Sequence, residues 1–518
     1  MEALDWLVIG VFFLALIGII VWVVRQKQND SADYFLGGRD ATWLAIGASI
    51  FASNIGSEHL IGLAGAGASS GMAMAHWEIQ GWMILILGWV FVPFYSRSMV
   101  YTMPEFLERR YNPQSRTILS VISLVSYVLT KVAVTVYAGG LVFQQVFGIK
   151  ELWGIDFFWI AAIGLVVLTA LYTIFGGMKS VLYTSVLQTP ILLLGSLIIL
   201  VLGFKELGGW DEMMRVCGAV TVNDYGDTMT NLIRSNDDAN FPWLGALIGS
   251  AIIGFWYWCT DQFIVQRVLS GKNEKEARRG TIFGAYLKLL PVFLFLIPGM
   301  IAFALHQKYI GAGGEGFLPM LANGTANADA AFPTLVAKLL PAGVKGLVVC
   351  GILAALMSSL ASLFNSSAML FTIDFYKRFR PETPEKKLVG IGQIATVVIV
   401  ILGILWIPIM RSVGDVLYTY LQDVQSVLAP GIAAAFLLGI CWKRTSAQGG
   451  MWGLIAGMII GLTRLGAKVY YSNAGEVADS TFKYLFYDMN WLFFCGWMFL
   501  FCIIVVIVVS LATEAPDR

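Results

Sequence analysis

The sequence predicts an all-α polytopic membrane protein, and two observations support this fold class: the composition and the spacing of apolar runs. Of the 518 residues, 58% are hydrophobic and only 13% are charged, and the formal net charge is +1. Such a composition excludes an ordinary soluble fold. Apolar runs of about 20 residues, the length that a helix needs to cross a lipid bilayer, recur along the whole chain. We therefore expect one transmembrane domain over residues 1–518, surrounded by lipid.

These runs predict about thirteen transmembrane helices. The candidate spans are 4–24, 41–66, 72–98, 117–147, 156–175, 181–203, 242–267, 281–305, 340–374, 388–410, 414–441, 448–470 and 489–511. The first run is too long for a cleavable signal peptide and ends without a small-residue cleavage site. We therefore count it as a spanning helix.

Basic residues in the connections between spans predict the orientation. Lys and Arg gather in alternate connections, and connections of this kind lie on the cytoplasmic side. The opposite connections include two long polar ones, 204–241 and 306–339. The alternation predicts a protein of the cell membrane with its N-terminus outside and its C-terminus in the cytoplasm.

Charge and the scatter of reactive residues limit the function. The balanced charge and the lack of a long basic cluster argue against a nucleic-acid partner, and no feature indicates an obligate protein partner. No nucleophile–base set or metal-ligand cluster is visible, and the three histidines, His59, His76 and His306, are dispersed. An enzyme is therefore not expected.

The second span contains a polar segment, Ala52–Leu63, that includes an asparagine, a glutamate and a histidine. A lipid-facing helix would lose free energy for each of these groups, so the segment must face protein, water or a ligand. Many secondary transporters bind an ion and a solute at unwound backbone near the bilayer midplane. The segment therefore suggests an ion-coupled transporter.

The ninth span carries small and hydroxyl residues at helical spacing. They are Ala355, Ser358, Ser359, Ser362 and Ser366. A stripe of this kind is common where membrane helices pack closely, and packing alone could explain it. Alternatively, the hydroxyls of Ser358 and Ser359 and the carbonyl of Ala355 complete a sodium site. Carbonyls of the broken second span, near Ala52 and Ile55, would supply its remaining oxygen ligands.

Two charged residues, Glu78 and Lys288, fall inside apolar spans. An intramembrane charge costs on the order of 2.5–3.5 kcal/mol on insertion scales, so each needs a partner or a function. A purely structural Glu–Lys bridge would satisfy this requirement. Together with the neutral groups of Asn54, His59 and Gln422, however, the two charges could bind a polyhydroxylated solute.

The seventh span holds the aromatic segment Phe255–Gln262, in which Tyr257 lies near an intramembrane Asp261. Aromatic faces suit the C–H face of a pyranose ring, although Trp and Tyr near a span's edge are more often interface anchors. Anchoring explains Trp256 and Trp258 adequately. It explains Tyr257 less well.

Several segments in order along the chain resemble the sodium/solute symporter family, and within it the sodium/glucose cotransporters. They are Asp33–Arg39, Ala52–Gly71, Gly88–Pro93, Met103–Phe106, Tyr257–Arg267, Ser358–Ser362 and Phe436–Arg444. The resemblance implies a LeuT-like core of two inverted five-helix repeats, residues 41–203 and 242–441. One extra helix, 4–24, precedes the core and two, within 448–511, follow it. It also implies broken helices at Ala52–Leu63 and around Gly254–Trp258.

The same resemblance implies a sodium site, a sugar site and gates. Sodium would bind at Ala52, Ile55, Ala355, Ser358 and Ser359. The sugar would bind at Asn54, His59, Glu78, Tyr257, Lys288 and Gln422. Tyr257 would also be the inner gate, and the outer gate would be formed by Leu63, Trp77 and Tyr418.

The function that the resemblance implies is import of a hexose, glucose or galactose, with sodium (Na+) as the coupling ion and by alternating access. Two positions depart from relatives. Ser185 stands where many carry an aspartate, so we expect one sodium per sugar, and Gly254 replaces an asparagine that contacts sugar in some bacterial relatives. Two alternatives remain open: another small solute such as myo-inositol, and a channel or sensor that responds to sodium and sugar.

Overall fold

The computed structural model describes residues 1–515 except 27, 29, 57, 322–323, 414–416 and 474–477, and it excludes the side chains of 129–130, 409–413, 417–423 and 472–473. In this part of the chain the regular secondary structure is helical, apart from a short antiparallel hairpin of β1 (Glu151–Leu152) and β2 (Ile155–Asp156). The helices are α1 Ala3–Val24, α2 Ser31–Leu36, α3 Trp43–Asn54, α4 Ala64–Ser70, α5 Ala75–Ile79, α6 Met83–Ile86, α7 Val92–Ser98, α8 Met103–Arg110, α9 Pro113–Ser126, α10 Ala133–Phe147, α11 Phe157–Leu207, α12 Trp210–Gly218, α13 Trp243–Gly254, α14 Gln262–Leu269, α15 Glu274–Leu287, α16 Ile297–Gly311, α17 Ala331–Leu339, α18 Val344–Met369, α19 Lys377–Phe379, α20 Glu385–Val413, α21 Leu417–Cys441, α22 Ala447–Asn473, α23 Thr481–Lys483 and α24 Trp491–Ala512.

The helices agree closely with the predicted spans. Among the described residues, ten continuous helical segments are long and apolar enough to cross a membrane. One of them, α11, covers two predicted spans because they meet at a kink. The second span is interrupted after α3, and the fourth is a continuous helix with a π-helical turn, Tyr127–Val132, between α9 and α10. The prediction of a helical polytopic membrane protein with about thirteen spans is confirmed.

The kink in α11 lies at Gly177, which has a φ of +54°. Glycine tolerates this conformation at little steric cost, whereas other residues rarely adopt it. A Cβ at Gly177 would also collide with the backbone of Tyr34, so the close approach of α2 excludes larger residues. The chain therefore changes direction here without leaving the membrane domain.

The predicted break in the second span is present. Helix α3 ends at Asn54, and Ile55 is extended with a ψ of 108°. A π-helical turn, Glu58–Leu63, then leads into α4. The break thus lies in the interior of the molecule, where Asn54, Ile55 and His59 are buried.

The second break lies a few residues later than predicted. Gly254 has helical φ and ψ, and a π-helical turn, Phe255–Thr260, continues the helix to Asp261, which is extended with a ψ of 128°. The Asp261 side chain accepts a hydrogen bond from the backbone N–H of Phe263 and so caps α14. The prediction of a break around Gly254–Trp258 is a few residues early, because the aromatic run stays helical and the chain becomes extended at Asp261, where α14 begins.

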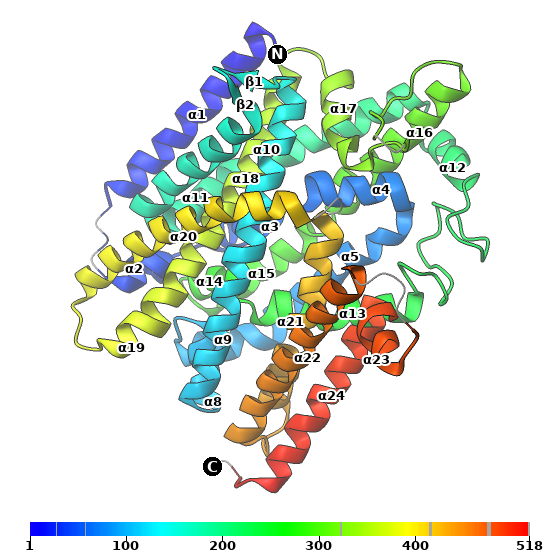
Figure 1. Ribbon diagram of the computed structural model, residues 1–518. Coiled ribbons are helices and arrows are strands. Elements are labelled where there is room, and N and C mark those ends of the chain that lie inside the picture. Colours follow the sequence, from blue (N-terminus) through cyan, green and yellow to red (C-terminus); the bar gives the residue numbers. More distant parts are fainter. Residues whose placement is uncertain are drawn as a thin grey trace.

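Helix α3 lies among long helices that bury almost all of it. It packs against α11, α15 and α18, and every residue from Ala45 to Asn54 is buried. Nearly all of α18 is buried as well. The C-terminal helices α21, α22 and α24 pack on one another at one side of this group (Figure 1). The first break is therefore held against α18 in the centre of the molecule.

Candidate functional site

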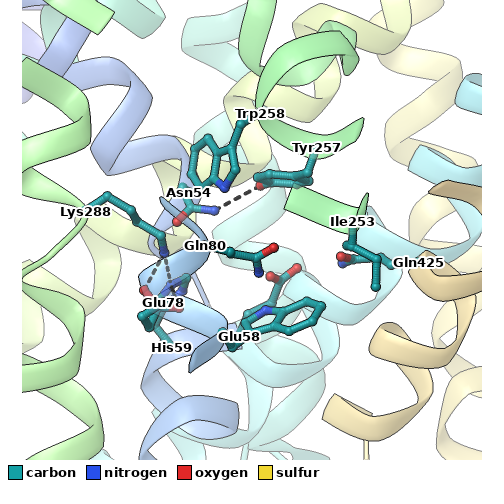
Figure 2. Close-up of a pocket in the computed structure, with 11 residues that line it drawn as sticks. Asn54, Glu58, His59, Glu78, Gln80, Ile253, Tyr257, Trp258, Lys288 and Gln425 are labelled. Atoms are coloured by element: carbon teal, nitrogen blue, oxygen red, sulfur yellow. Dashed lines mark hydrogen bonds and ion pairs between the residues drawn. The ribbon is translucent and has the colours of Figure 1, made fainter. Parts of the chain in front are cut away.

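A small cavity lies beside the first break (Figure 2). It is lined by Asn54, Glu58, His59, Trp77, Glu78, Gln80, Ile253, Tyr257, Trp258, Lys288 and Gln425. These residues come from the broken second span, the third span, the end of α13 and the aromatic segment after it, the end of α15, and α21. The cavity therefore joins both halves of the chain.

A buried charged group occupies one side of this cavity. Lys288 Nζ lies 2.6 Å from Glu78 Oε2 and 2.8 Å from His59 Nε2. His59 Nε2 also lies 3.3 Å from Glu78 Oε1, and all three side chains are at most 4% exposed. The predicted Glu–Lys bridge therefore exists. Because its members also line the cavity, it can bind a solute as well as hold two spans together.

Tyr257 closes another side of the cavity. The Asn54 side-chain amide donates a 3.0 Å hydrogen bond to the Tyr257 hydroxyl (Figure 2). The Tyr257 ring meets that of Trp258 edge to face, with centroids 4.9 Å apart. An aromatic ring linked to the break in this way is suited to contact the apolar face of a ring-shaped solute.

Five of the six predicted sugar-site residues line the cavity, as does the predicted gate residue Trp77. The side chains of Gln422 and Tyr418 lie outside the described part of the structure. Leu63, the remaining gate residue, is buried on the π-helical turn. The structure thus brings together the six residues that line the cavity, and the roles of all the predicted residues remain predictions.

The sequence analysis did not predict that Gln80, Ile253, Trp258 and Gln425 line a cavity. It assigned no role to Glu58. Gln80 could have been found because it is a polar residue inside an apolar span, close to Glu78. Trp258 was assigned to the membrane interface, but it is only 1% exposed and faces the cavity. Ile253 carries no signal in the sequence.

The residues of the predicted sodium site lie where α18 meets the break. The Ser359 hydroxyl donates to the carbonyl oxygens of Ser53, at 2.7 Å, and Ile55, at 3.3 Å. Ala52, Ala355 and Ser358 are buried on the same two helices. Carbonyl and hydroxyl dipoles from an unwound helix are the ligands that sodium takes in many transporters. The described residues contain no cluster of His, Cys, Asp and Glu that could hold another metal.

A chain of serine hydroxyls continues from this site toward α11. Ser358 Oγ lies 3.3 Å from Ser185 Oγ, which lies 3.4 Å from Ser49 Oγ. Arg267 Nε approaches Ser49 Oγ at 3.2 Å and Ser53 Oγ at 3.0 Å. Ser185 is therefore part of a buried polar layer, with the Arg267 guanidinium at its edge, next to the predicted sodium site.

A second small cavity separates the sodium-site residues from Lys131. Its lining includes Asn54, Glu58, Lys131, Tyr257 and Ser359. Lys131 Nζ forms a 2.7 Å ion pair with Asp261 Oδ2 and lies 4.6 Å from the centre of the Tyr257 ring. Because Asn54, Glu58 and Tyr257 line both cavities, they connect the two candidate sites.

Comparison with known proteins gives matches over the whole chain. Residues 34–457 match the model of the sodium:solute symporter family. Sodium/myo-inositol cotransporter 2 of Mus musculus is 37% identical over 100% of this chain and 78% of the relative. Sodium/glucose cotransporter 1 of Ovis aries is 38% identical over 99% of this chain and 79% of the relative.

A solved structure shares the fold. A Na+-coupled sialic acid symporter in a substrate-bound, outward-open state superposes with a TM-score of 0.79 over 100% of this chain and 99% of the symporter chain, at 21% sequence identity. At this identity the likeness concerns the fold alone. It confirms the predicted fold class, a LeuT-like core.

Proposed function

The chain belongs to the sodium:solute symporter family, and from this we propose that it imports a neutral cyclic polyol, a hexose such as glucose or galactose, together with one sodium ion. It is a sodium-coupled membrane transporter and not an enzyme. The observation that carries the choice of solute is the buried group of Glu78, Lys288 and His59 on the wall of the cavity.

This charged group suits a molecule rich in hydroxyls. A carboxylate accepts hydrogen bonds and an ammonium donates them, and hydrogen bonds to charged groups are roughly twice as strong as neutral ones. A hydroxyl can satisfy both, whereas an anionic solute would meet the Glu78 carboxylate. Tyr257 and Trp258 add aromatic surface for the C–H face of the ring.

Sodium would bind where Ser359 meets the carbonyl oxygens of the break. Ala52, Ile55, Ala355 and Ser358 would complete its oxygen ligands. Binding there orders the segment that also carries Asn54 and His59, so sodium raises the affinity for the solute. Linkage requires the solute to raise the affinity for sodium by the same factor. This reciprocity is the proposed basis of coupling.

Alternating access would follow from two gates. Tyr257, which is hydrogen-bonded to Asn54, would close the cavity toward the cytoplasm. Trp77, Leu63 and Tyr418 would close it toward the outside. When both ligands are bound, the outer gate closes and the loaded core rocks to open inward, as in other carriers with repeated halves.

The driving force is sufficient for strong accumulation. One positive charge moving through 100 mV supplies about 2.3 kcal/mol, and a tenfold sodium gradient adds about 1.4 kcal/mol. The sum of about 3.7 kcal/mol corresponds to a concentration ratio of a few hundred. A single sodium ion per solute is therefore enough for uphill import.

The proposed setting is the cell membrane, with the N-terminus outside, the C-terminus in the cytoplasm and lipid as the only obligate surroundings. The two inverted repeats would be residues 41–203 and 242–441. Helix 4–24 would lie before the core and the helices of 448–511 after it. No obligate protein partner is required by this arrangement.

The test is uptake of labelled glucose, galactose and myo-inositol into proteoliposomes, with and without an imposed sodium gradient. We expect sodium-dependent accumulation above equilibrium for at least one of the three. Sugar binding without accumulation would instead indicate a sensor or a channel. If none of the three responds to sodium, the proposal is wrong.

myo-Inositol is a second candidate solute, and one observation favours it. A relative that is 37% identical over this whole chain is a sodium/myo-inositol cotransporter. myo-Inositol is also a six-membered ring with hydroxyls, so the same cavity groups could bind it. The relative uptake of myo-inositol and glucose in the experiment above decides between them.

A further inference from the structure

Glu58 is a charged residue of the cavity wall that the proposed function does not use. Its neighbour in the cavity, Glu78, is paired with Lys288 and His59. In the described part of the chain, the Glu58 carboxylate takes part in no ion pair, although it lines both cavities. It is also the first residue of the π-helical turn that follows the break.

Two lysines face Glu58, one from each cavity. Lys288 lines the first cavity together with Glu58, and Lys131 lines the second. Each lysine already has a nearer carboxylate, Glu78 at 2.6 Å and Asp261 at 2.7 Å. The Glu58 charge is therefore left to interact with whatever enters the cavity.

The cavity that Glu58 lines contains unpaired hydrogen-bond acceptors beside one unpaired indole donor, Trp258 Nε1. Asn54 Oδ1 and Gln80 Oε1 are buried and have no hydrogen-bond partner in the structure. Both residues line the same cavity as Glu58 (Figure 2). Leaving such acceptors unpaired costs free energy, so a ligand that donates several hydrogen bonds here would bind more tightly.

We propose that Glu58 makes this cavity accept an amino sugar, a hexose that carries an ammonium group, at least as well as the neutral hexose. The inference rests on the proposed function and adds a substrate class to it. An ammonium offers three donors and a positive charge, and its hydrogen bond to a carboxylate is charge-assisted. The same carboxylate repels a sugar acid, so uronates are excluded.

Competition for sodium-driven uptake of labelled hexose in proteoliposomes tests this proposal. Unlabelled glucosamine, glucose, 2-deoxyglucose and glucuronate are the competitors, at about pH 6, where a sugar amine is protonated because α-amino groups titrate near pH 8. We expect glucosamine to compete at concentrations no higher than glucose, and glucuronate to compete at least tenfold more weakly. If the glucosamine concentration needed for half inhibition were tenfold higher than that of glucose, the proposal would be overturned.

Variants assign the effect to Glu58. In Glu58→Gln the glucosamine concentration needed for half inhibition should rise at least tenfold, while that of glucose changes less than threefold. Glu58→Asp keeps the charge and should retain most of the preference. Asp237→Asn removes an exposed acid from the loop before α13 and should leave the preference unchanged.

The outcomes separate the two proposals. If Glu58→Gln still takes up neutral hexose with sodium but shows the wild-type response to glucosamine, the role of Glu58 is refuted and the proposed function stands. If no hexose is taken up with sodium by the wild type, the proposed function fails first. Should Glu58→Gln fail to insert into the membrane, Glu58→Asp and the wild-type competition series still decide the matter.

Discussion

The Ser359 hydroxyl lies 3.3 Å from the carbonyl oxygen of Ile55, at the residue where the broken second span leaves its helical conformation. The contact ties α18 to the break from the sodium side. On the other side of the break, Asn54 contacts Tyr257 and His59 contacts Lys288. One short segment therefore touches both candidate sites, which is the arrangement that coupling of two ligands requires.

Ser359→Ala should weaken activation by sodium. The change removes a hydroxyl ligand but leaves the cavity groups in place, so the sodium concentration for half-maximal uptake should rise about tenfold, the equivalent of about 1.4 kcal/mol. The affinity for hexose at saturating sodium should change much less. Initial uptake rates measured over a series of sodium concentrations give both values.

The matched control for this prediction is Glu78→Ala, which should chiefly impair hexose binding. The two variants must be compared with each other, because a general loss of stability would impair both sodium activation and hexose binding in both proteins. Equal effects of the two changes on both ligands would show that the division into a sodium site and a sugar site is wrong.

Replacing one partner of the Glu78–Lys288 pair should lower the stability of the protein more than replacing both partners. Loss of one partner leaves a buried charge without compensation, which typically destabilises a protein by about 3–5 kcal/mol, whereas replacing both by apolar residues is often neutral. Glu78→Ala alone should therefore lower thermal stability in detergent. Lys288→Met added to Glu78→Ala should restore stability without restoring uptake.

This double variant also tests the alternative of a purely structural bridge. If the pair served only to join two spans, the double variant would recover both stability and transport. Recovery of stability alone is the result that supports a role in solute binding.

The sequence predicted the helices well because membrane insertion depends on the length and hydropathy of each span, and both can be counted. The break at Ala52–Leu63 was predictable for the same reason, since Asn54 and His59 are costly in lipid. The second break was misplaced because Asp261 acts through a local cap that depends on geometry. Ile253 was missed because an apolar side chain on an apolar span gives no sign of facing a cavity.

Glu58 shows a different limit. Its charge was visible in the sequence, but its role depended on which lysines had other partners. That information is three-dimensional: Lys131 pairs with Asp261 across 130 residues of sequence, and Lys288 pairs with Glu78. The Glu58 carboxylate is available to a ligand because both lysines are paired with other carboxylates.

Low pH should loosen the long loop between α12 and α13. Burial alone would raise the pKa of Asp238, but the backbone N–H groups of Phe241 and Asn240, the Asn223 amide and Arg234 hold this pKa below its ordinary value. A lowered pKa in the folded state means that the stabilisation is complete above the unfolded value of about 3.9 and is lost as the pH falls below it.

Limited proteolysis of the loop measures this effect. Cleavage of the wild type should accelerate as the pH falls from about 3.9, the unfolded value, toward the lowered pKa of Asp238. Asp238→Asn should be cleaved faster at neutral pH and should show a smaller change with pH. A wild-type loop that is equally resistant at both pH values would contradict the prediction.

Asp261 and Lys131 should be a structural pair that supports the inner gate and does not bind solute. Both side chains are at most 5% exposed, Asp261 caps α14, and it also accepts a hydrogen bond from the Tyr127 hydroxyl. Asp261→Asn removes the charge that compensates Lys131, which lies over the Tyr257 ring. We therefore expect Asp261→Asn to lower thermal stability and maximal uptake, with the hexose concentration for half-maximal uptake changed less than threefold.

Lys131→Met combined with Asp261→Asn should recover much of the stability, because the buried charge is then absent. If Asp261→Asn instead raised the half-maximal hexose concentration tenfold or more while leaving stability unchanged, Asp261 would act on the solute, and the boundary between the cavity and the gate would have to be moved to include it.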